Sequence, residues 1–404
     1  MADAWDSVVG MLMMNENKWL PARYTNEVDV IRRLSNVPQL CDKLKRWLHT
    51  LQNVCPVDEN KSHKLRKEGN EMYQNRHTND VGSKILHAYN KAIFAAPRGS
   101  KALAQGHANR ALLLMWLGRY REAFDDCQLA LSDAYPKQDR LKVLFRQADC
   151  AVKLDDGDAL CAAIKGLEAE ANSQPLSTAA HLKLLELRTR HEVASNPAKD
   201  LRDGSKEVTD TMLPELKEQY NPAVGRHVVT AVPIAEDGII ARESAFSFVP
   251  VYDSDNRTTL PSYDCQQCAR VNVIPFPCPT CARACYCSTS CRVAHATVHR
   301  YECFGYQRRL WRDVGIAHLG IRCLLDGFET IRAEIANAND ALSCYNNFLA
   351  SSFEASDDEK RLQYGLVLRL VTNFDKMERS DVLQYSLVEL DVPYAQGAAV
   401  DTQE

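Results

Sequence analysis

The 404-residue sequence has no apolar run of about eighteen residues or more, so we expect no membrane-spanning helix. Its first residues, Met1 to Met14, include two acidic side chains and lack the basic stretch and small-residue cleavage site of a secretory signal peptide. These absences predict a protein of the cytoplasm and nucleus. In that reducing environment dense cysteine serves metal binding or catalysis rather than disulfide bonds.

The sequence also lacks an excess of positive charge, low-complexity segments and long runs of like charge. Its formal net charge is −4, its pI is about 6.3, and 45% of its residues are hydrophobic. A protein that binds nucleic acid needs a basic surface to displace counterions from the phosphates. We therefore expect an ordinary soluble globular protein of two or three domains, with neither nucleic acid nor a membrane among its partners.

Cysteine is the residue type that is concentrated. Eight of the fifteen cysteines lie in the short segment 265–303, which includes the stretch CPTCARACYCSTSCRVAHATVHRYEC. Zinc prefers four thiolate or imidazole ligands, and a C-x-x-C turn supplies two of them. The spacing gives four such pairs: Cys265 and Cys268, Cys278 and Cys281, Cys287 and Cys291, and His299 and Cys303.

Eight ligands fill two closed sites, which leaves no open position for a substrate, so we expect structural zinc. A segment this short has almost no apolar core. Metal binding would therefore supply most of its folding free energy, on the order of 10 kcal/mol per ion.

This spacing resembles the MYND zinc finger, and CYCSTSC is similar to that family's YCSxxC. The resemblance implies interleaved sites, with two zinc ions held by Cys265, Cys268, Cys287 and Cys291 and by Cys278, Cys281, His299 and Cys303. Cys285 is then a spare thiol and His295 a solvated helix residue, with His295 as a rival ligand. The metal-loaded finger is close to neutral, so we expect it to bind short peptides or to be purely structural.

Residues 62–200 have helical periodicity with small residues at regular positions. Aligning Tyr89 and Ala92 with Cys127 and Ala130 gives a repeat of 38 residues, near the roughly 34 of tetratricopeptide repeats. The alternative is an unrelated helical bundle. Residues 1–61 are predicted to be helices that pack on the end of this array, with Trp47 in their core, and residues 201–224 to be a linker.

Residues 225–260 are rich in β-branched residues, and Asp237-Gly238 is a turn signal between two strand-like runs. Just before a MYND finger, this segment resembles the opening of a split SET domain. In that family the Gly-Arg-Gly turn helps to hold S-adenosylmethionine, which would place Gly225, Arg226 and His227 at the cofactor. His227 replaces the second glycine of that turn, which puts the contact in doubt.

The order of repeats, first SET segment, finger and following helices is similar to that of the SMYD lysine methyltransferases that carry tetratricopeptide repeats. Residues 304–404 correspond to a helical SET insertion and a divergent tail. The fold class is therefore mainly α with a small β part. Residues 304–404 contain none of the family's N-H-S-C and G-E-E-L motifs, and Tyr394 lacks the context of the catalytic tyrosine.

Two functions follow from this resemblance. The chain is a truncated protein-lysine methyltransferase, inactive as it stands, or it is a non-catalytic zinc-binding adaptor of the chaperone co-factor type. Chaperone-binding repeats hold the C-terminal EEVD tail of heat-shock proteins with five residues. These are a basic residue and an Asn four positions apart in the sequence, a second Asn, and a Lys and an Arg four positions apart. The matching residues here are Arg66, Asn70, Asn109, Lys142 and Arg146.

Overall fold

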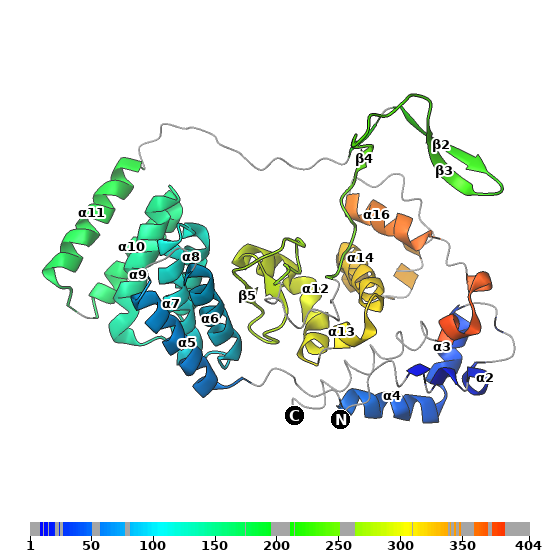
Figure 1. The fold of residues 1–404 in the computed structure, drawn as a ribbon, viewed down its shortest axis with the longest axis horizontal. Coiled ribbons are helices and arrows are strands. Elements are labelled where there is room, and N and C mark those ends of the chain that lie inside the picture. The colour runs from blue at the N-terminus through cyan, green and yellow to red at the C-terminus, as the bar shows by residue number, and fades with distance from the viewer. Residues whose placement is uncertain are drawn as a thin grey trace. The chain divides into compact units, whose positions relative to one another are not determined.

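The structure is a computed structural model. It describes residues 9–50 and 310–383 with gaps, and residues 57–76, 81–173, 175–194, 211–250 except 214, and 263–308. The chain is mainly helical with a few short strands, as predicted (Figure 1). Contacts divide it into two compact units, of which the first comprises residues 1–197, 249–329 and 370–404 and the second residues 198–248 and 330–369. Among the described residues, no helix is both long and apolar enough to cross a membrane.

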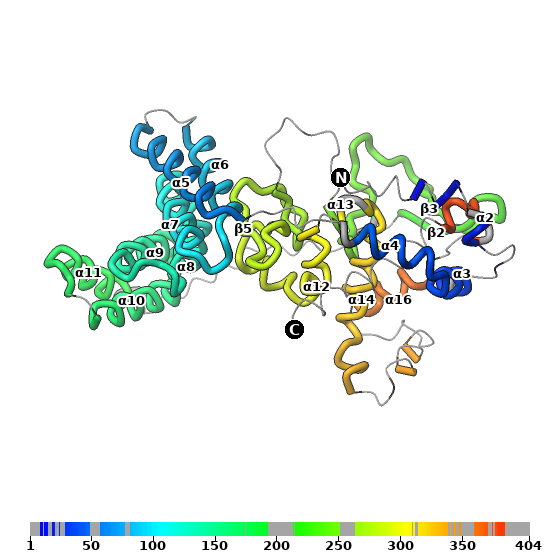
Figure 2. Tube along the Cα trace, turned by 90° about the horizontal axis from the view of Figure 1, so that it is seen from below, coloured from blue at the N-terminus to red at the C-terminus, as the bar shows by residue number. Residues whose placement is uncertain are grey.

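The largest part of the first unit is a series of antiparallel helix pairs, which we call the helical array (Figure 2). The pairs are α5 (Glu59–Gln74) with α6 (Val81–Ala95), α7 (Lys101–Trp116) with α8 (Tyr120–Ala130), and α9 (Arg140–Lys153) with α10 (Gly157–Ala171), followed by α11 (Thr178–Ala194). Two of these helices, α5 and α7, begin with a side-chain cap: the Asp58 side chain accepts from Lys61 N, and the Ser100 side chain accepts from Leu103 N.

Small side chains let these helices approach closely. Ala104, Ala108 and Ala111 of α7 are buried against Cys127, Ala130 and Val143. Gly69 of α5 faces the ring of Tyr89, and a Cβ there would lie 2.6 Å from that ring. The first helices of successive pairs, α5, α7 and α9, are therefore neighbours, and their side chains form one continuous face.

The N-terminal helices α2 (Glu16–Trp19), α3 (Glu27–Ser35) and α4 (Pro38–Thr50) bury an apolar core that includes Trp47, as expected. Tyr24, which precedes α3, meets the ring of Phe374 edge-to-face at 5.4 Å. The sequence predicted packing on the end of the array. It gave no sign of this contact with the C-terminal part of the chain, because the two rings are far apart in sequence.

The cysteine-rich segment is built from a two-stranded sheet and one long helix. Strand β5 (Phe276–Pro277) pairs antiparallel with β6 (Cys285–Tyr286), and α12 (Thr289–Gln307) follows. The Ser288 side chain caps α12 by accepting from Cys291 N. Helices α13 (Leu310–Val314) and α14 (Ala317–Asn337) come next.

The second unit contains the other strands, and their pairing differs from the expected hairpin. Strand β2 (Leu216–Asn221) pairs with β3 (Gly225–Thr230), and β1 (Thr211–Met212) with β4 (Ala241–Arg242). The hairpin therefore closes at 222–224, inside the expected linker 201–224. Asp237-Gly238 does form a turn, in which Gly238 N donates to Ala235 O at 3.0 Å and Asp237 has φ +62°, but β3 and β4 on either side of it pair with other strands. The Asn221 side chain accepts from Ala223 N, and Gly225 has φ +76°, which favours a tight turn there.

A small aromatic core completes the second unit. Tyr364 of α16 (Glu359–Leu368) stacks on Phe246 and on Phe348, with ring centroids 5.9 and 5.7 Å apart. Residues from before and after the cysteine-rich segment are thus brought together. The predicted tail around Tyr394 lies outside the described residues.

Candidate metal centre and peptide-binding face

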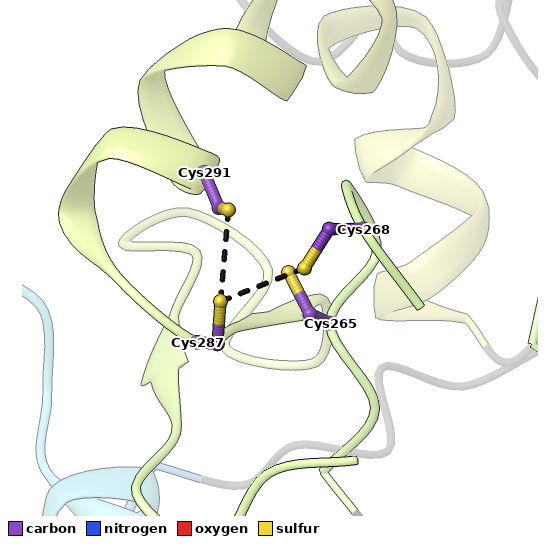
Figure 3. Close-up of side chains that lie close together, drawn as sticks. All are labelled: Cys265, Cys268, Cys287 and Cys291. Carbon is purple, nitrogen blue, oxygen red and sulfur yellow. Dashed lines mark hydrogen bonds between the residues drawn. The ribbon is translucent and has the colours of Figure 1, made fainter. Parts of the chain in front are cut away.

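Four cysteines of the first predicted site converge on one point. Their sulfur atoms all lie within 4.8 Å of one another and point toward a common centre (Figure 3). Cys287 Sγ is 3.6 Å from Cys268 Sγ and 3.6 Å from Cys291 Sγ. Two sulfurs bound tetrahedrally to zinc at about 2.3 Å lie about 3.8 Å apart, so Cys265, Cys268, Cys287 and Cys291 fit that ion.

The second predicted set also converges. Cys278, Cys281, His299 and Cys303 place one donor atom each within 4.8 Å of one another. Cys281 Sγ and His299 Nε2 are 3.6 Å apart, which equals the roughly 3.6 Å expected between a sulfur and a nitrogen on one tetrahedral zinc ion. Each set thus combines one C-x-x-C pair with a pair contributed from beyond it in the chain.

The backbone of each C-x-x-C pair has the same conformation. Ala269 N donates to Cys265 O at 2.9 Å, and Ala282 N donates to Cys278 O at 2.9 Å. Both alanines have a positive φ, of 55° and 51°. A residue in the left-handed conformation after each pair bends the chain so that both thiols point the same way. Metal binding is an interaction strong enough to stabilise this unfavourable backbone conformation.

The thiols cannot all ionise without a cation between them. Hydrogen bonds from Cys281 and Cys303 lower the pKa of Cys278 far below its ordinary value, whereas the hydrogen bond to Cys278 raises that of Cys281. Opposite shifts in adjacent cysteines mean that one thiolate forms at the expense of its neighbours. A divalent cation removes this conflict, because it stabilises every thiolate at once.

The two residues left over by the spacing are both buried. Cys285 donates to Arg283 O, and burial raises its pKa to about 12, so it is an inert thiol. The prediction that His295 is solvated was wrong: it is 3% exposed, and its Nδ1 lies 3.0 Å from the Tyr286 hydroxyl. Burial lowers the pKa of His295 to about 3, so it stays neutral. His295, His299 and Glu302 also place one donor atom each within 4.8 Å of one another. These three residues form a third donor set, in which His295 is the rival ligand that the sequence suggested.

Sequence reasoning missed a buried ionic cluster beside the second metal set. Glu302 is fully buried, and its carboxylate accepts from His318 Nε2 at 2.7 Å and Arg322 Nη2 at 2.7 Å. Burial alone would raise the pKa of Glu302, but His318 and Arg322 lower it to about 2. The cluster fixes α12, which carries the metal donors Cys291, His299 and Cys303, against α14. Its one signal in the sequence is the spacing of His318 and Arg322, four residues apart on one helix face.

The five predicted clamp residues lie on the first helices of the array. We call the side of the array that carries Arg66, Asn70, Asn109, Lys142 and Arg146 the first-helix face. Asn109 Nδ2 donates to Asn70 Oδ1 at 2.7 Å, and Tyr89 OH donates to the same oxygen at 2.9 Å. The structure thus joins the two asparagines although 39 residues separate them.

The basic members of this set are placed less uniformly. Arg146 donates to Ala108 O at 3.1 Å, beside Asn109. Burial raises the pKa of Tyr89 and of Tyr135, and Arg66 and Arg146 oppose both shifts, so the two arginines share a neighbourhood. Lys142 points elsewhere: its Nζ lies 2.8 Å from Asp139 Oδ1, and its side chain is 70% exposed.

Arg66 stands beside a cavity of about 290 Å³, which is lined by Glu59, His63, Arg66, Lys101, Ala102 and Gln105. Its Nε is buried and has no hydrogen-bond partner. Burial lowers the pKa of Arg66, which means that its charge has lost solvation that no carboxylate replaces. An anionic group in this cavity would supply both missing interactions.

Gly225, Arg226 and His227, the residues predicted to contact S-adenosylmethionine, begin strand β3. The His227 ring contacts Gly225 O through Nδ1 at 3.0 Å, and the Arg226 side chain is exposed. They lie on a hairpin in which five of the six residues of β2 and three of the six residues of β3 are exposed. The cofactor contact stays a prediction.

Comparison with known proteins agrees with the geometry of the finger. Residues 265–303 match the MYND finger family. The chain is 27% identical over 334 residues to the protein-lysine N-methyltransferase SMYD4 of Pongo abelii, and 27% identical over 337 residues to that of Homo sapiens; each match covers 74% of this chain. The SMYD4 protein of Gallus gallus is 28% identical over 270 residues, or 59% of this chain.

The matches cover 40% of the Pongo abelii and Homo sapiens proteins and 36% of the Gallus gallus protein. This chain therefore corresponds to less than half the length of these relatives. No solved structure matches it.

Proposed function

Because the finger and the sequence similarity both support a place for this chain in the SMYD family, we propose that it is the protein-recognition part of a SMYD-type protein-lysine N-methyltransferase. The observation that carries this proposal is the pair of closed four-donor groups within a segment that matches the MYND family. In this proposal the finger and a tetratricopeptide-type array bind proteins.

The zinc ions have a structural role in this proposal. Cys265, Cys268, Cys287 and Cys291 hold one ion, and Cys278, Cys281, His299 and Cys303 hold the other. Four protein donors complete a tetrahedral site, so no water or substrate reaches the metal. The ions supply folding free energy to a segment whose own core is small.

The polypeptide by itself should transfer no methyl groups. S-adenosylmethionine supplies the methyl group in this family, and the N-H-S-C and G-E-E-L motifs that accompany its use are absent from residues 304–404. The second candidate function is a non-catalytic adaptor, and the feature that favours it is the first-helix face.

A metal assay and a calorimetric titration test these proposals together. The purified chain should carry two zinc ions, and Cys278→Ser and Cys287→Ser should each remove one. Titration with S-adenosylmethionine should give no heat of binding at micromolar concentration. One ion or none in the unaltered chain would reject the two-site finger, whereas micromolar cofactor binding would reject the inactive polypeptide.

The partner proposed for the first-helix face is the free C-terminus of a protein that ends in acidic residues, such as the EEVD tail of a heat-shock chaperone. Two arginines and two asparagines gather there, and Arg66 Nε–H is unpaired beside the cavity. Lys142 can join them, because an exposed ion pair such as Lys142–Asp139 contributes only about 0–1 kcal/mol and is readily exchanged.

Peptide binding separates this proposal from a merely basic surface. A peptide ending in EEVD should bind to the full chain at micromolar concentration, and more weakly as salt increases. The same peptide with an amidated C-terminus is the control, because amidation removes the terminal charge and nothing else. Equal affinity for both peptides would rule out recognition of the carboxylate.

A further inference from the structure

One arginine of the array is completely buried, and it hydrogen-bonds to the finger. Arg110 of α7 is 0% exposed. Its Nε and Nη2 donate to the two oxygens of Asp126 in α8, at 2.7 and 2.9 Å, and its Nη1 donates to Asn90 Oδ1 in α6 at 2.7 Å. The same Nη1 also donates to Pro275 O of the finger at 2.9 Å.

Other side chains around Arg110 make contacts of the same kind. Asn90 Nδ2 donates to Val273 O at 2.9 Å, so two finger carbonyls, two residues apart, are both bound. At the start of α12, Thr289 N donates to Asp125 Oδ2 at 3.3 Å. The ring of Phe94 stacks on that of Tyr263, with centroids 5.3 Å apart. We call the surface formed by Asn90, Phe94, Arg110, Asp125 and Asp126 the second-helix face, since all but Arg110 lie on α6 or α8.

The electrostatics around Arg110 show why its buried guanidinium needs the finger. The Asp126 carboxylate neutralises the Arg110 guanidinium, and His107 Nδ1 also lies 2.8 Å from it, so both carboxylate oxygens are already engaged. A guanidinium taken out of water must keep its donors paired. Within the array, Arg110 bonds to Asp126 and Asn90. Pro275 O accepts from its remaining side, and Phe276 covers it with the ring centroid 5.3 Å from Arg110 Cζ.

The loop that docks here owes its shape to the finger. Asn272 Nδ2 donates to Tyr286 O, and Asn272 Oδ1 accepts from Ile274 N, which turns the chain just before Pro275. Phe276 then pairs with Tyr286 in the β5–β6 sheet, and the metal donor Cys278 follows. If zinc folds the finger, zinc also sets the positions of the two carbonyls that Asn90 and Arg110 bind.

We infer that the second-helix face is a docking surface whose occupant is the finger of the same chain, and that zinc in the finger stabilises helices α6 to α8 through Arg110 and Asn90. The inference rests on zinc binding by the finger, which belongs to the proposed function. Finger and array then form one recognition body, in which the first-helix face remains available to a partner.

Hydrogen–deuterium exchange of the full chain tests the coupling, with zinc bound and after treatment with a chelator. Loss of hydrogen bonds to a buried charged group should speed exchange in α6, α7 and α8, within residues 81–130, by about tenfold or more. Exchange in α10 and α11, within 157–194, should not change, because these helices lie outside the second-helix face. Acceleration confined to residues 263–308 would overturn the inference. No change anywhere would show instead that the chain holds no removable zinc, which is a failure of the proposed function.

Two variants identify the residues that carry the coupling. The double variant Arg110→Met with Asp126→Leu removes both charges together, so neither is left buried and unpaired. Asn90→Ala is milder and removes the bond to Val273 O. Either variant should still bind zinc. Chelation should speed hydrogen exchange in residues 81–130 less than it does in the unaltered chain, and in the double variant the acceleration should be smaller by about tenfold.

Arg146→Met is the matched control, because it removes an arginine from the first-helix face and should leave the coupling intact. Full coupling in the double variant would overturn the role of Arg110. If the double variant does not fold, Asn90→Ala and the unaltered chain still decide the result.

Discussion

The two faces of the helical array differ although both present arginine and asparagine. Asn109 and Arg110 are neighbours in α7, yet Asn109 bonds to Asn70 on the first-helix face and Arg110 bonds to Asp126 and Pro275 on the second-helix face. On the second-helix face the arginine is buried and its charge is neutralised, whereas on the first-helix face Arg66 keeps an unpaired Nε–H. A face whose donors are already paired serves structure, whereas an unpaired donor such as Arg66 Nε–H is what the proposed peptide site requires.

The largest effect should follow from Asp126→Ala on the second-helix face. This change leaves the Arg110 charge buried without its partner, which should lower the free energy of unfolding by about 3–5 kcal/mol. Urea denaturation followed by circular dichroism measures it. Asp139→Ala is the control, because it breaks only the exposed pair with Lys142 and should cost less than about 0.5 kcal/mol. Similar losses in the two variants would remove the difference between the faces.

The same carboxylate predicts a dependence on acid. Burial alone would raise the pKa of Asp126, but Arg110 and His107 hold it below its ordinary value. A group whose pKa is depressed in the folded state stabilises the protein above its unfolded pKa, about 3.9 for Asp, and loses that contribution as the pH falls. The unaltered chain should therefore lose more stability below about pH 4 than the double variant Arg110→Met with Asp126→Leu, which lacks the group. Parallel stability curves for the two proteins would contradict this.

On the first-helix face the expected loss is in binding rather than in folding. Arg146→Ala removes a charge that can bond to a peptide carboxylate, so the affinity for an EEVD peptide should fall by about 1.5–3 kcal/mol. Fluorescence anisotropy with a labelled peptide measures the change. Arg121→Ala provides the comparison, since Arg121 pairs with Asp156 on an exposed part of α8 and should leave the affinity unaltered. If both variants bound alike, the face would not be the peptide site.

The smallest effect concerns how closely the helices of the first pair approach. A Cβ at Gly69 would lie 2.6 Å from the ring of Tyr89, whose hydroxyl orients Asn70. Gly69→Ala should cost about 1–3 kcal/mol of stability through overpacking and should weaken peptide binding as well. At Gly157 a Cβ meets nothing within 4 Å, so Gly157→Ala should be neutral or slightly stabilising. Thermal denaturation of the two variants makes the comparison.

The eight metal donors could be predicted from the sequence because their positions depend on local spacing. A C-x-x-C turn brings two thiols together whatever surrounds it, and Cys287 and Cys291, like His299 and Cys303, are four residues apart. The mainly helical fold followed for the same reason, since helical periodicity and caps are local properties. The hairpin was misplaced because Asp237-Gly238 and Asn221–Gly225 both form turns, and only strand pairing decided that the second of them closes a hairpin.

By itself the sequence determined the finger, with its two donor sets, and the helical class of the chain, because both arise from residues a few positions apart. Only the tertiary structure decided what the individual polar residues do. Glu302 is paired with His318 and Arg322 of α14, and Arg110 is bound by a finger loop 165 residues later, so neither partner lies close by in the sequence. The cost of an unpaired charge away from water depends on contacts between distant segments. Those contacts separate Arg110, which holds the chain together, from Arg66, which is left with an unpaired donor beside a cavity.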